Sequence, residues 1–317
     1  MAEPFSGDHP AIGGIRLVLG GNVFGWTIDS DQGFRVLDTF FEAGGRMIDT
    51  AEGYSSWVPG NKGGESEAII GAWMESRGVR KDMLVATKTG QSGAPGCLAV
   101  SSVATALEGS LERLRTDYID LYYAHRDDPE TALEDVIGAF DAAFRAGKVR
   151  ELGASNHTPA RLAEAFAIAN RIGARSYTVV QQRYNLIDRF EYEGEMQDLC
   201  VAHGIAVLPY YGLASGFLTG KFRAASDWNS SRRAHALNNA AANGGWNVLA
   251  ALDAIAVQNG ATPAQIALAW LNAKPGIAAP ICSATSPEQV TDLVGGVRLE
   301  LTPTQLSALD EAGAAVS

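Results

Sequence analysis

Short apolar runs alternate with longer amphipathic segments along most of this 317-residue sequence. This alternation is typical of repeated βα units around a parallel sheet, whose strands are buried on both faces. The runs rich in Val, Ile, Leu and Tyr are the predicted strands, at residues 15–19, 46–49, 83–88, 118–125, 151–155, 178–182, 205–210 and 277–281. Eight strands separated by helices predict an α/β fold, a (β/α)8 TIM barrel.

The segments between these strands carry apolar residues at spacings of three and four, which predicts helices. These helices are expected at residues 32–43, 66–77, 99–115, 131–146, 158–172, 191–203 and 262–273. Thr158 and Thr262 each precede a proline, the expected order of an N-cap and a first helical residue. We interpret residues 226–245, rich in Asn, Ser, Arg and Gly, as a long, mobile surface loop. No linker interrupts the pattern, so one domain is expected over residues 1–317.

Charge and composition limit the partners of the protein. A net charge of −11 and a pI near 4.9 argue against nucleic acid and anionic membrane, both of which require a positive face. The first ten residues are polar, and no apolar run approaches the roughly 18 residues of a membrane span, so neither a secretory signal nor a membrane anchor is expected. The three cysteines have no metal-like spacing, and we interpret them as reduced thiols of a cytoplasmic, metal-free protein. Small molecules are the expected partners; the oligomeric state is not indicated.

Polar side chains close most of the predicted strands, at the end where barrel enzymes carry their active sites. These residues are Asp49, Lys88, His125, Ser155, Asn156, Gln181 and Tyr210. Each of them taken alone has a structural interpretation as a turn or cap residue. Several ionisable groups that converge on one barrel mouth instead predict a coupled cluster, of the kind that acid and base catalysis uses to shift pKa values.

The segments that contain these residues resemble a known family, the aldo-keto reductases. The resemblance rests first on "MIDTAEGY", "LVATKTG" and "IDLYYAHRDD", and it extends over nearly the whole chain. It implies an NAD(P)-dependent oxidoreductase built on a (β/α)8 barrel. By this resemblance the catalytic residues are Asp49, Tyr54, Lys88 and His125.

Three further segments resemble the parts of that family that bind the nicotinamide nucleotide. "LGASNH" implies that Ser155 and Asn156 hold the carboxamide, and "QQRYN" implies a contact from Gln181. "LPYYGLASGFLTGK" is similar to the segment whose tyrosine, here Tyr210, stacks on the nicotinamide ring. The same segment implies nucleotide contacts from Tyr211, Gly212, Leu213, Ser215, Gly216 and Lys221.

The segment after the eighth predicted strand, "PICSATSPEQVTDLVGG", departs from the family pattern. It contains no Lys or Arg, and Leu293 stands where the family commonly has an Asn. Ser286 and Pro287 predict a helix start whose amides face a phosphate. Lys221 and Arg223 are the expected cations for the nucleotide phosphates, and NADPH is expected, with NADH as the alternative. The residues expected to hydrogen-bond the nucleotide in this segment are Ser283, Thr285 and Gln289.

The predicted chemistry is reduction of an aldehyde or ketone, or the reverse reaction. A phenol with a pKa near 10 is a poor acid at neutral pH unless a cation lies beside it. We expect the ammonium of Lys88 to lower the pKa of Tyr54, and Asp49 to hold that ammonium in place. His125 would then orient the substrate oxygen, and Tyr54 would supply the proton.

Aromatic residues in predicted loops indicate where the substrate binds. Trp26, Trp57 and Trp228 suit an apolar pocket, and Arg126 suits a polar group of the substrate. The alternatives are ordinary packing of the loops against the barrel and, for Arg126, a solvated charge at the rim. The sequence does not name the carbonyl substrate.

Two other functions fit part of the pattern. Lys88 at a strand end could form a Schiff base in an aldolase-like barrel. The chain could also be a cofactor-occupied, redox-sensing or regulatory subunit with little turnover, because some members of the family it resembles serve as subunits of ion channels.

Overall fold

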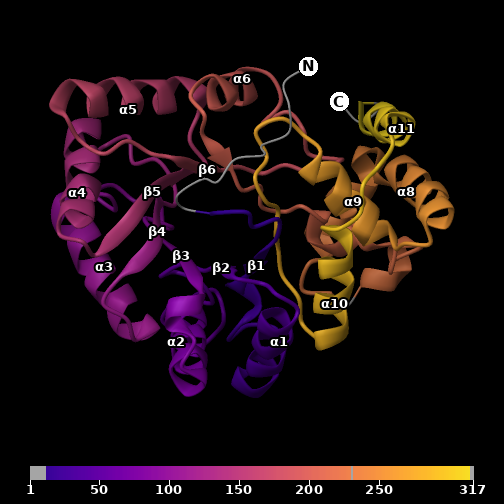
Figure 1. Cartoon of the computed structure of the whole chain (residues 1–317), viewed down its shortest axis with the longest axis horizontal. Helices are drawn as coiled ribbons and strands as arrows, with labels where there is room; N and C mark the ends of the chain where they lie inside the picture. Colours follow the sequence, from indigo (N-terminus) through magenta and orange to yellow (C-terminus); the bar gives the residue numbers. More distant parts are fainter. Residues whose placement is uncertain (1–11, 230, 315–317) are drawn as a thin grey trace.

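The structure of the protein is a computed structural model that describes residues 12–229 and 231–314. The opening segment, for which the sequence predicts no secretory signal, lies outside the described residues. In the described part, helices form an outer ring around a central group of strands (Figure 1). None of these described helices combines the length and the apolar character needed to cross a membrane.

The central strands form one parallel sheet in the order β7-β6-β5-β4-β3-β2-β1-β8. Its two end strands meet at a seam, where Val207 N donates to Gly276 O over 3.0 Å and Ala278 N donates to Val207 O over 2.9 Å. The sheet therefore curls into a (β/α)8 barrel, and the predicted fold class is confirmed. The strands are β1 Val18–Gly20, β2 Met47–Asp49, β3 Leu84–Thr89, β4 Ile119–Ala124, β5 Val149–Ser155, β6 Val179–Gln181, β7 Ala206–Val207 and β8 Ile281–Cys282.

Every predicted strand overlaps an observed one, and the last of them differs most. β8 comprises only Ile281–Cys282, whereas the prediction was residues 277–281. Pro280 has no N–H group and interrupts the hydrogen bonds of the strand, so Ile277 forms only an isolated bridge, to Val207.

The helices expected from the apolar spacing are all present, with small differences at their ends. They are α1 Ser30–Glu42, α2 Glu65–Arg77, α3 Val100–Leu114, α4 Leu133–Arg145, α5 Pro159–Ile172, α6 Glu195–Ala202 and α9 Pro263–Asn272. The hydroxyls of Thr158 and Thr262 accept hydrogen bonds from the third residue of their helices, each over 3.2 Å, so both predicted N-caps are confirmed. Helix α10, Pro287–Gly296, begins after Ser286, as predicted.

The interpretation of residues 226–245 as a mobile surface loop is wrong. The described residues form η4 (Ala225–Trp228), α7 (Ala234–Ala240) and the π-helical turn η5 (Ala241–Gly245), before α8 (Trp246–Asn259). The Trp228 and Trp246 rings stack with centroids 5.9 Å apart, and Leu237 is buried. Ala and Leu are strong helix formers and the two rings supply a shared core, so together they outweigh the turn-forming Asn and Gly.

Besides α7, two helices had no counterpart in the sequence prediction, α8 and α11 (Pro303–Ala314). Figure 1 shows α8 on the outer side of α9, with α11 beside it. They thicken the wall of the barrel on the side of α9 and do not lie at its mouth.

Strand side chains alternate between two apolar cores, one inside the barrel and one between the strands and the helices. On β3, Ala86 belongs to the inner core and Val85 to the outer one. On β4, Tyr123 belongs to the inner core and Tyr122 to the outer one. Because the alternation has a period of two residues, it also decides which side chains at the strand ends point into the barrel mouth.

Candidate active site

Three of the four predicted catalytic residues continue the inward-facing positions of three adjacent strands, and the fourth, Tyr54, lies in the turn after β2. Asp49 lies two residues after the inward-facing Met47 of β2, and Lys88 lies two residues after Ala86 of β3. His125 has the same spacing from the last inward-facing residue of β4. The pleat of the strands therefore brings these three side chains to one mouth.

Lys88 is the centre of this group, with its ammonium bonded to three oxygens. Nζ contacts the Asp49 carboxylate and donates to Thr50 O over 2.8 Å and to the Tyr54 hydroxyl over 3.0 Å. The second carboxylate oxygen of Asp49 accepts a hydrogen bond of 2.9 Å from Gln181 Nε2. The carboxylate predicted at the end of a buried strand is thus paired and hydrogen-bonded, which offsets the cost of burying it.

Burial and charge oppose each other in the Lys88–Asp49 pair. Burial alone would lower the pKa of Lys88, but the Asp49 carboxylate and Tyr54 outweigh it, and the pKa of Lys88 is raised. Burial raises the pKa of Asp49, and the Lys88 charge and two hydrogen bonds oppose that rise. The amine of Lys88 is therefore held as an ammonium.

The expectation that Lys88 lowers the pKa of Tyr54 is only half right. The Lys88 charge and hydrogen bond do act in that direction. Burial of the phenol is the larger effect, the Asp49 carboxylate adds to it, and the net pKa of Tyr54 is raised above 10.0. Tyr54 therefore keeps its proton at neutral pH and presents it beside the Lys88 ammonium.

His125 is a partly buried, neutral imidazole at the same mouth. Burial lowers its pKa well below the ordinary 6.5, and the charges of Lys88 and Arg126 lower it further. Its ring lies edge-on to the Tyr54 ring with centroids 5.9 Å apart, and its buried Nδ1 has no hydrogen-bond partner in the described part of the chain. A neutral ring beside the phenol can donate one hydrogen bond to a substrate oxygen.

A second polar group follows β5. Asn156, with a φ of 56°, donates from Nδ2 to His125 O and to the Ser155 hydroxyl, each over 2.9 Å. Its Oδ1 accepts a hydrogen bond of 2.8 Å from the Tyr210 hydroxyl, whose pKa burial raises to about 12. These bonds fix the Tyr210 ring against the strand ends.

A pocket of about 230 Å³ lies at this cluster. The predicted site residues that line it are Asp49, Tyr54, Trp57, His125, Arg126, Ser155, Asn156, Gln181, Tyr210, Tyr211 and Ser283. Asn22 and Gln91 line it as well and were missed, because neither closes a predicted strand. The Trp57 and Tyr54 rings meet with centroids 6.1 Å apart, so an apolar wall stands next to the phenol.

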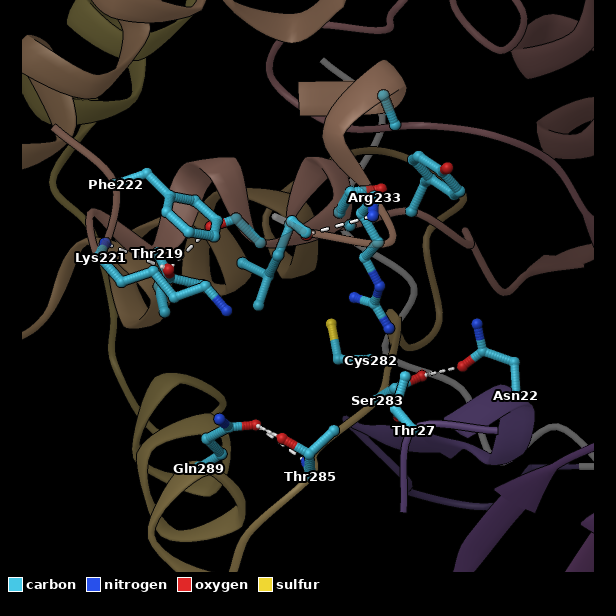
Figure 2. A pocket seen from close by; sticks show the side chains of 18 of the residues that line it. Asn22, Thr27, Thr219, Lys221, Phe222, Arg233, Cys282, Ser283, Thr285 and Gln289 are labelled. Carbon is cyan, nitrogen blue, oxygen red and sulfur yellow. Dashed lines mark hydrogen bonds between the residues drawn. The ribbon is translucent and has the colours of Figure 1, made fainter. Parts of the chain in front are cut away.

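A larger cavity of about 890 Å³ adjoins the small pocket (Figure 2). The predicted site residues that line it are Trp26, Tyr211, Gly212, Leu213, Ser215, Gly216, Lys221, Ser283, Thr285 and Gln289. Asn22, Tyr211 and Ser283 line both spaces, so the two are continuous. The Ser283 hydroxyl donates to Asn22 Oδ1 over 2.5 Å and joins the ends of β8 and β1 at the boundary.

Three cations of the large cavity, Lys221, Arg232 and Arg233, have no ion pair with any described residue. Arg232 donates a hydrogen bond of 3.0 Å to Trp26 O, and the side chains of Lys221 and Arg233 make no hydrogen bond with a described side chain. Figure 2 shows both side chains turned toward the same open space. Burial lowers the pKa of each, and the Arg233 charge lowers that of Lys221 further. Partly desolvated cations of this kind are suited to bind an anionic group of a ligand.

Arg233 was not identified from the sequence as a cation of this cavity. Arg223 was expected to accompany Lys221 instead. Arg223 does not line the cavity: its guanidinium is paired with Asp253 over 2.5 Å. The basic residue was sought after the eighth strand and beside Lys221, whereas the structure supplies it from the residue before α7. The adjacent arginines 232 and 233 could have indicated a binding site for an anion. They were passed over because residues 226–245 were interpreted as a mobile loop.

The chain between β7 and the large cavity has an unusual backbone. Tyr211, Ala214 and Ser215 have φ values of 66°, 47° and 59°, a region that non-glycine residues rarely occupy, and Gly216 has a φ of 95°. Successive residues of this kind turn backbone N–H groups toward one side, which suits an anion. Strained conformations of this type concentrate at functional sites.

One predicted substrate residue does not reach either space. Trp228 is 1% exposed, and its Nε1 donates to Asn238 Oδ1 over 2.8 Å. It packs between Phe217 and Trp246 in the core beneath α7, so its assignment to the substrate pocket is wrong. Trp26 does lie at the cavity, where its ring meets that of Trp57 edge-on at 5.6 Å.

Fold and site together define a (β/α)8-barrel protein with a titratable cluster at its mouth and a nucleotide-sized cavity beside it. The Aldo/keto reductase family model matches residues 16–314. The chain belongs to the aldo/keto reductase family, whose members use NAD(P)H.

Individual relatives agree with this family. The chain is 31% identical to the uncharacterized oxidoreductase YrpG of Bacillus subtilis, over 93% of this chain and 91% of that one. It is 30% identical to norsolorinic acid reductase B of Aspergillus parasiticus, over 93% and 78%. It is also 30% identical to a probable voltage-gated potassium channel subunit beta of Oryza sativa subsp. japonica, over 85% and 83%.

Proposed function

We propose that this protein reduces an aldehyde or ketone to the alcohol, or catalyses the reverse reaction, with NADPH. The observation that carries the proposal is the contact of the Lys88 ammonium with both the Asp49 carboxylate and the Tyr54 hydroxyl, next to a cavity of about 890 Å³. The relatives named as oxidoreductases support the same class of reaction. The partner is a small carbonyl or alcohol compound, and we place the activity in the cytoplasm.

In this mechanism each polar group of the mouth has a separate task. A nicotinamide nucleotide held by the residues of the large cavity would supply the hydride that the carbonyl carbon accepts. His125 donates a hydrogen bond to the carbonyl oxygen and orients it, because its imidazole is neutral. Tyr54 gives its proton to the same oxygen as negative charge develops there. Lys88 stabilises the phenolate that remains, and Asp49 keeps the ammonium aligned.

The residues around the large cavity fit a dinucleotide. Lys221, Arg232 and Arg233 offer three positive charges without an ion pair for its phosphates. Ser155, Asn156 and Gln181 present polar atoms at the boundary with the catalytic cluster. NADPH carries one phosphate more than NADH, so three cations without an ion pair favour NADPH. The other proposed contacts are those of Tyr210, Tyr211, Gly212, Leu213, Ser215, Gly216, Ser283, Thr285 and Gln289.

The test combines nucleotide titration with removal of one hydroxyl. Titration with NADPH and NADH, followed by protein fluorescence, should give tighter binding of NADPH. With the tighter nucleotide, Tyr54→Phe should lower carbonyl reduction by about a hundredfold or more while binding of the nucleotide changes less than about twofold. Full activity in Tyr54→Phe would refute the mechanism.

Tyr122→Phe is the matched control for that variant. Tyr122 lies on β4, is buried in the outer core, and its hydroxyl has no hydrogen-bond partner in the described structure. Its loss should leave carbonyl reduction unchanged. An equal fall in both variants would mean that any buried hydroxyl matters, and would refute the specific role of Tyr54.

Two alternative functions make different predictions. A Schiff base needs an unprotonated amine, whereas Lys88 is held as an ammonium by Asp49, so the aldolase-like function is disfavoured. A regulatory subunit with bound cofactor is supported by the similarity to the channel subunits. Such a subunit should release its nucleotide slowly and hardly turn over simple aldehydes, so rapid multiple turnover would exclude it.

A further inference from the structure

Arg126 is a cation of the small pocket that has no partner. It follows His125 directly, is exposed, and lines the same pocket as Tyr54 and Trp57. In the described residues its side chain makes no ion pair and no hydrogen bond, although the neighbouring arginines do. Arg161 is paired with Asp127 over 3.0 Å, and Arg183 is paired with Asp188 over 3.0 Å.

The charges of the small pocket do not balance without a ligand. Among the described residues, Asp49 is the only acidic one that lines it, and the Lys88 ammonium already neutralises that carboxylate. His125 is neutral. Arg126 therefore adds one uncompensated positive charge to the pocket of a protein whose net charge is −11. A substrate that carries an anion would restore neutrality at this point.

A second polar group of the same pocket also lacks a partner. Gln91 lines the pocket, and its Oε1 is buried without a hydrogen bond among the described residues. A side chain at position 53 would meet this oxygen, because a Cβ built on Gly53 lies 2.0 Å from it. Gly53 thus leaves room for Oε1, which only accepts hydrogen bonds and therefore does not suit a carboxylate. The Nε2 group of the same amide makes no hydrogen bond with a described residue, and it is the group of Gln91 that can donate to an anion.

The remaining walls of the pocket are aromatic. Trp57 is 44% exposed, and its ring stands edge-on to those of Trp26 and Tyr54. A volume of about 230 Å³ is below the roughly 300–1,000 Å³ of pockets for larger ligands, so it suits a compound with one ring.

We propose that Arg126 and Gln91 form a subsite for a carboxylate, and that the preferred substrate is a single-ring carbonyl acid. This inference rests on the proposed carbonyl reduction and adds the class of compound reduced. The carbonyl group would face Tyr54 and His125, the ring would lie against Trp57, and the carboxylate would meet the Arg126 guanidinium.

The test compares acids with neutral compounds of nearly the same shape. The probes are 3- and 4-carboxybenzaldehyde and the matching 3- and 4-formylbenzamides, assayed with the preferred nucleotide. For at least one position, kcat/KM of the acid should exceed that of the amide by about tenfold or more. In Arg126→Gln this ratio should fall by about tenfold to a hundredfold, mainly through KM, and Arg126→Lys should recover part of it.

Arg171→Gln is the matched charge control. Arg171 lies on α5, where it pairs with Glu134 over 2.7 Å at the surface, outside both the small pocket and the large cavity. The Arg171→Gln substitution removes the same charge as Arg126→Gln and should leave the acid-to-amide ratio of kcat/KM unchanged. A comparable fall in Arg171→Gln would mean a general charge effect and would overturn the proposal. Thermal unfolding of each variant confirms that folded proteins are compared.

The outcomes separate this inference from the function on which it rests. If the amides are reduced as well as the acids, carbonyl reduction stands and the carboxylate subsite is wrong. If neither acids nor amides are reduced with either nucleotide, the proposed function fails and the inference fails with it.

Discussion

Lys88 has no exposed surface, and each of its partners is fixed by the end of a strand or the turn that follows it. Removing one member of a buried ion pair leaves the other charge without compensation. Lys88→Met should therefore lower the free energy of unfolding by about 3–5 kcal/mol, because the Asp49 carboxylate stays buried. Urea or guanidinium unfolding, monitored by tryptophan fluorescence, measures this change.

The double variant Lys88→Met/Asp49→Asn is the control for that measurement. It removes both charges, and the amide at position 49 can still accept the hydrogen bond from Gln181. The double variant should therefore be more stable than Lys88→Met alone. If the second substitution instead destabilises further, the ion pair is not the reason for the loss.

At the scale of single residues, the sequence predicted what the strand periodicity controls. Asp49, Lys88 and His125 were found because each closes an apolar run, and the structure brings them together at one mouth. Arg233 was missed because it precedes a short helix that itself was missed. The raised pKa of Tyr54 depends on how far its hydroxyl is buried, which the position of a residue in a sequence does not reveal.

At the scale of elements, one contact between neighbouring strands depends on the absence of a side chain. Gly153 of β5 pairs with Tyr123 of β4, and a Cβ at position 153 would lie 2.4 Å from the Tyr123 ring. That ring is fully buried in the inner core, with no space into which it could move freely. Gly153→Ala should therefore lower the free energy of unfolding by about 1–3 kcal/mol, as measured by urea unfolding.

The opposite sign is expected for a glycine with free space around it. Gly138 lies inside α4, and a Cβ there meets no atom within 4 Å. Gly138→Ala should stabilise the protein by about 0.5–1 kcal/mol, since alanine loses less backbone entropy in a helix. Equal effects of the two substitutions would contradict the steric explanation for Gly153.

The strands were easier to predict than the helices for a physical reason. Each strand is buried on both faces, so its apolar run is continuous and visible in the sequence. α7 is short and rich in Asn, and it forms because Trp228, Trp246 and Leu237 pack together across a turn. The stability of α7 thus comes from tertiary packing between segments, which the local amino-acid composition does not predict.

At the scale of the whole molecule, two histidines with lowered pKa values, one partly and one fully buried, connect stability with pH. Burial lowers the pKa of His125 and of His157, so each stays neutral in the folded protein where an exposed histidine would be protonated. Below about pH 6.5 the unfolded chain therefore binds more protons than the folded one. The free energy of unfolding should fall with falling pH, by up to about 1.4 kcal/mol per unit for each histidine.

Urea unfolding between pH 5 and 8 tests this dependence. The double variant His125→Gln/His157→Gln should have a smaller slope of unfolding free energy against pH below about pH 6.5. An unchanged slope in that variant would show that other groups cause the acid sensitivity.

The seam between β7 and β8 is closed by two of the shortest strands of the barrel, and the large cavity lies across its end. One wall of the cavity comes from residues after β7, such as Gly212 and Ser215, and the facing wall from Ser283 and Thr285 beyond β8. A ligand that contacts both walls would bridge the seam and hold together the part of the barrel that its two shortest strands close. Ligand binding and closure of the barrel are thus thermodynamically linked: a bound ligand raises the free energy needed to open the seam, and a closed seam raises the affinity for the ligand.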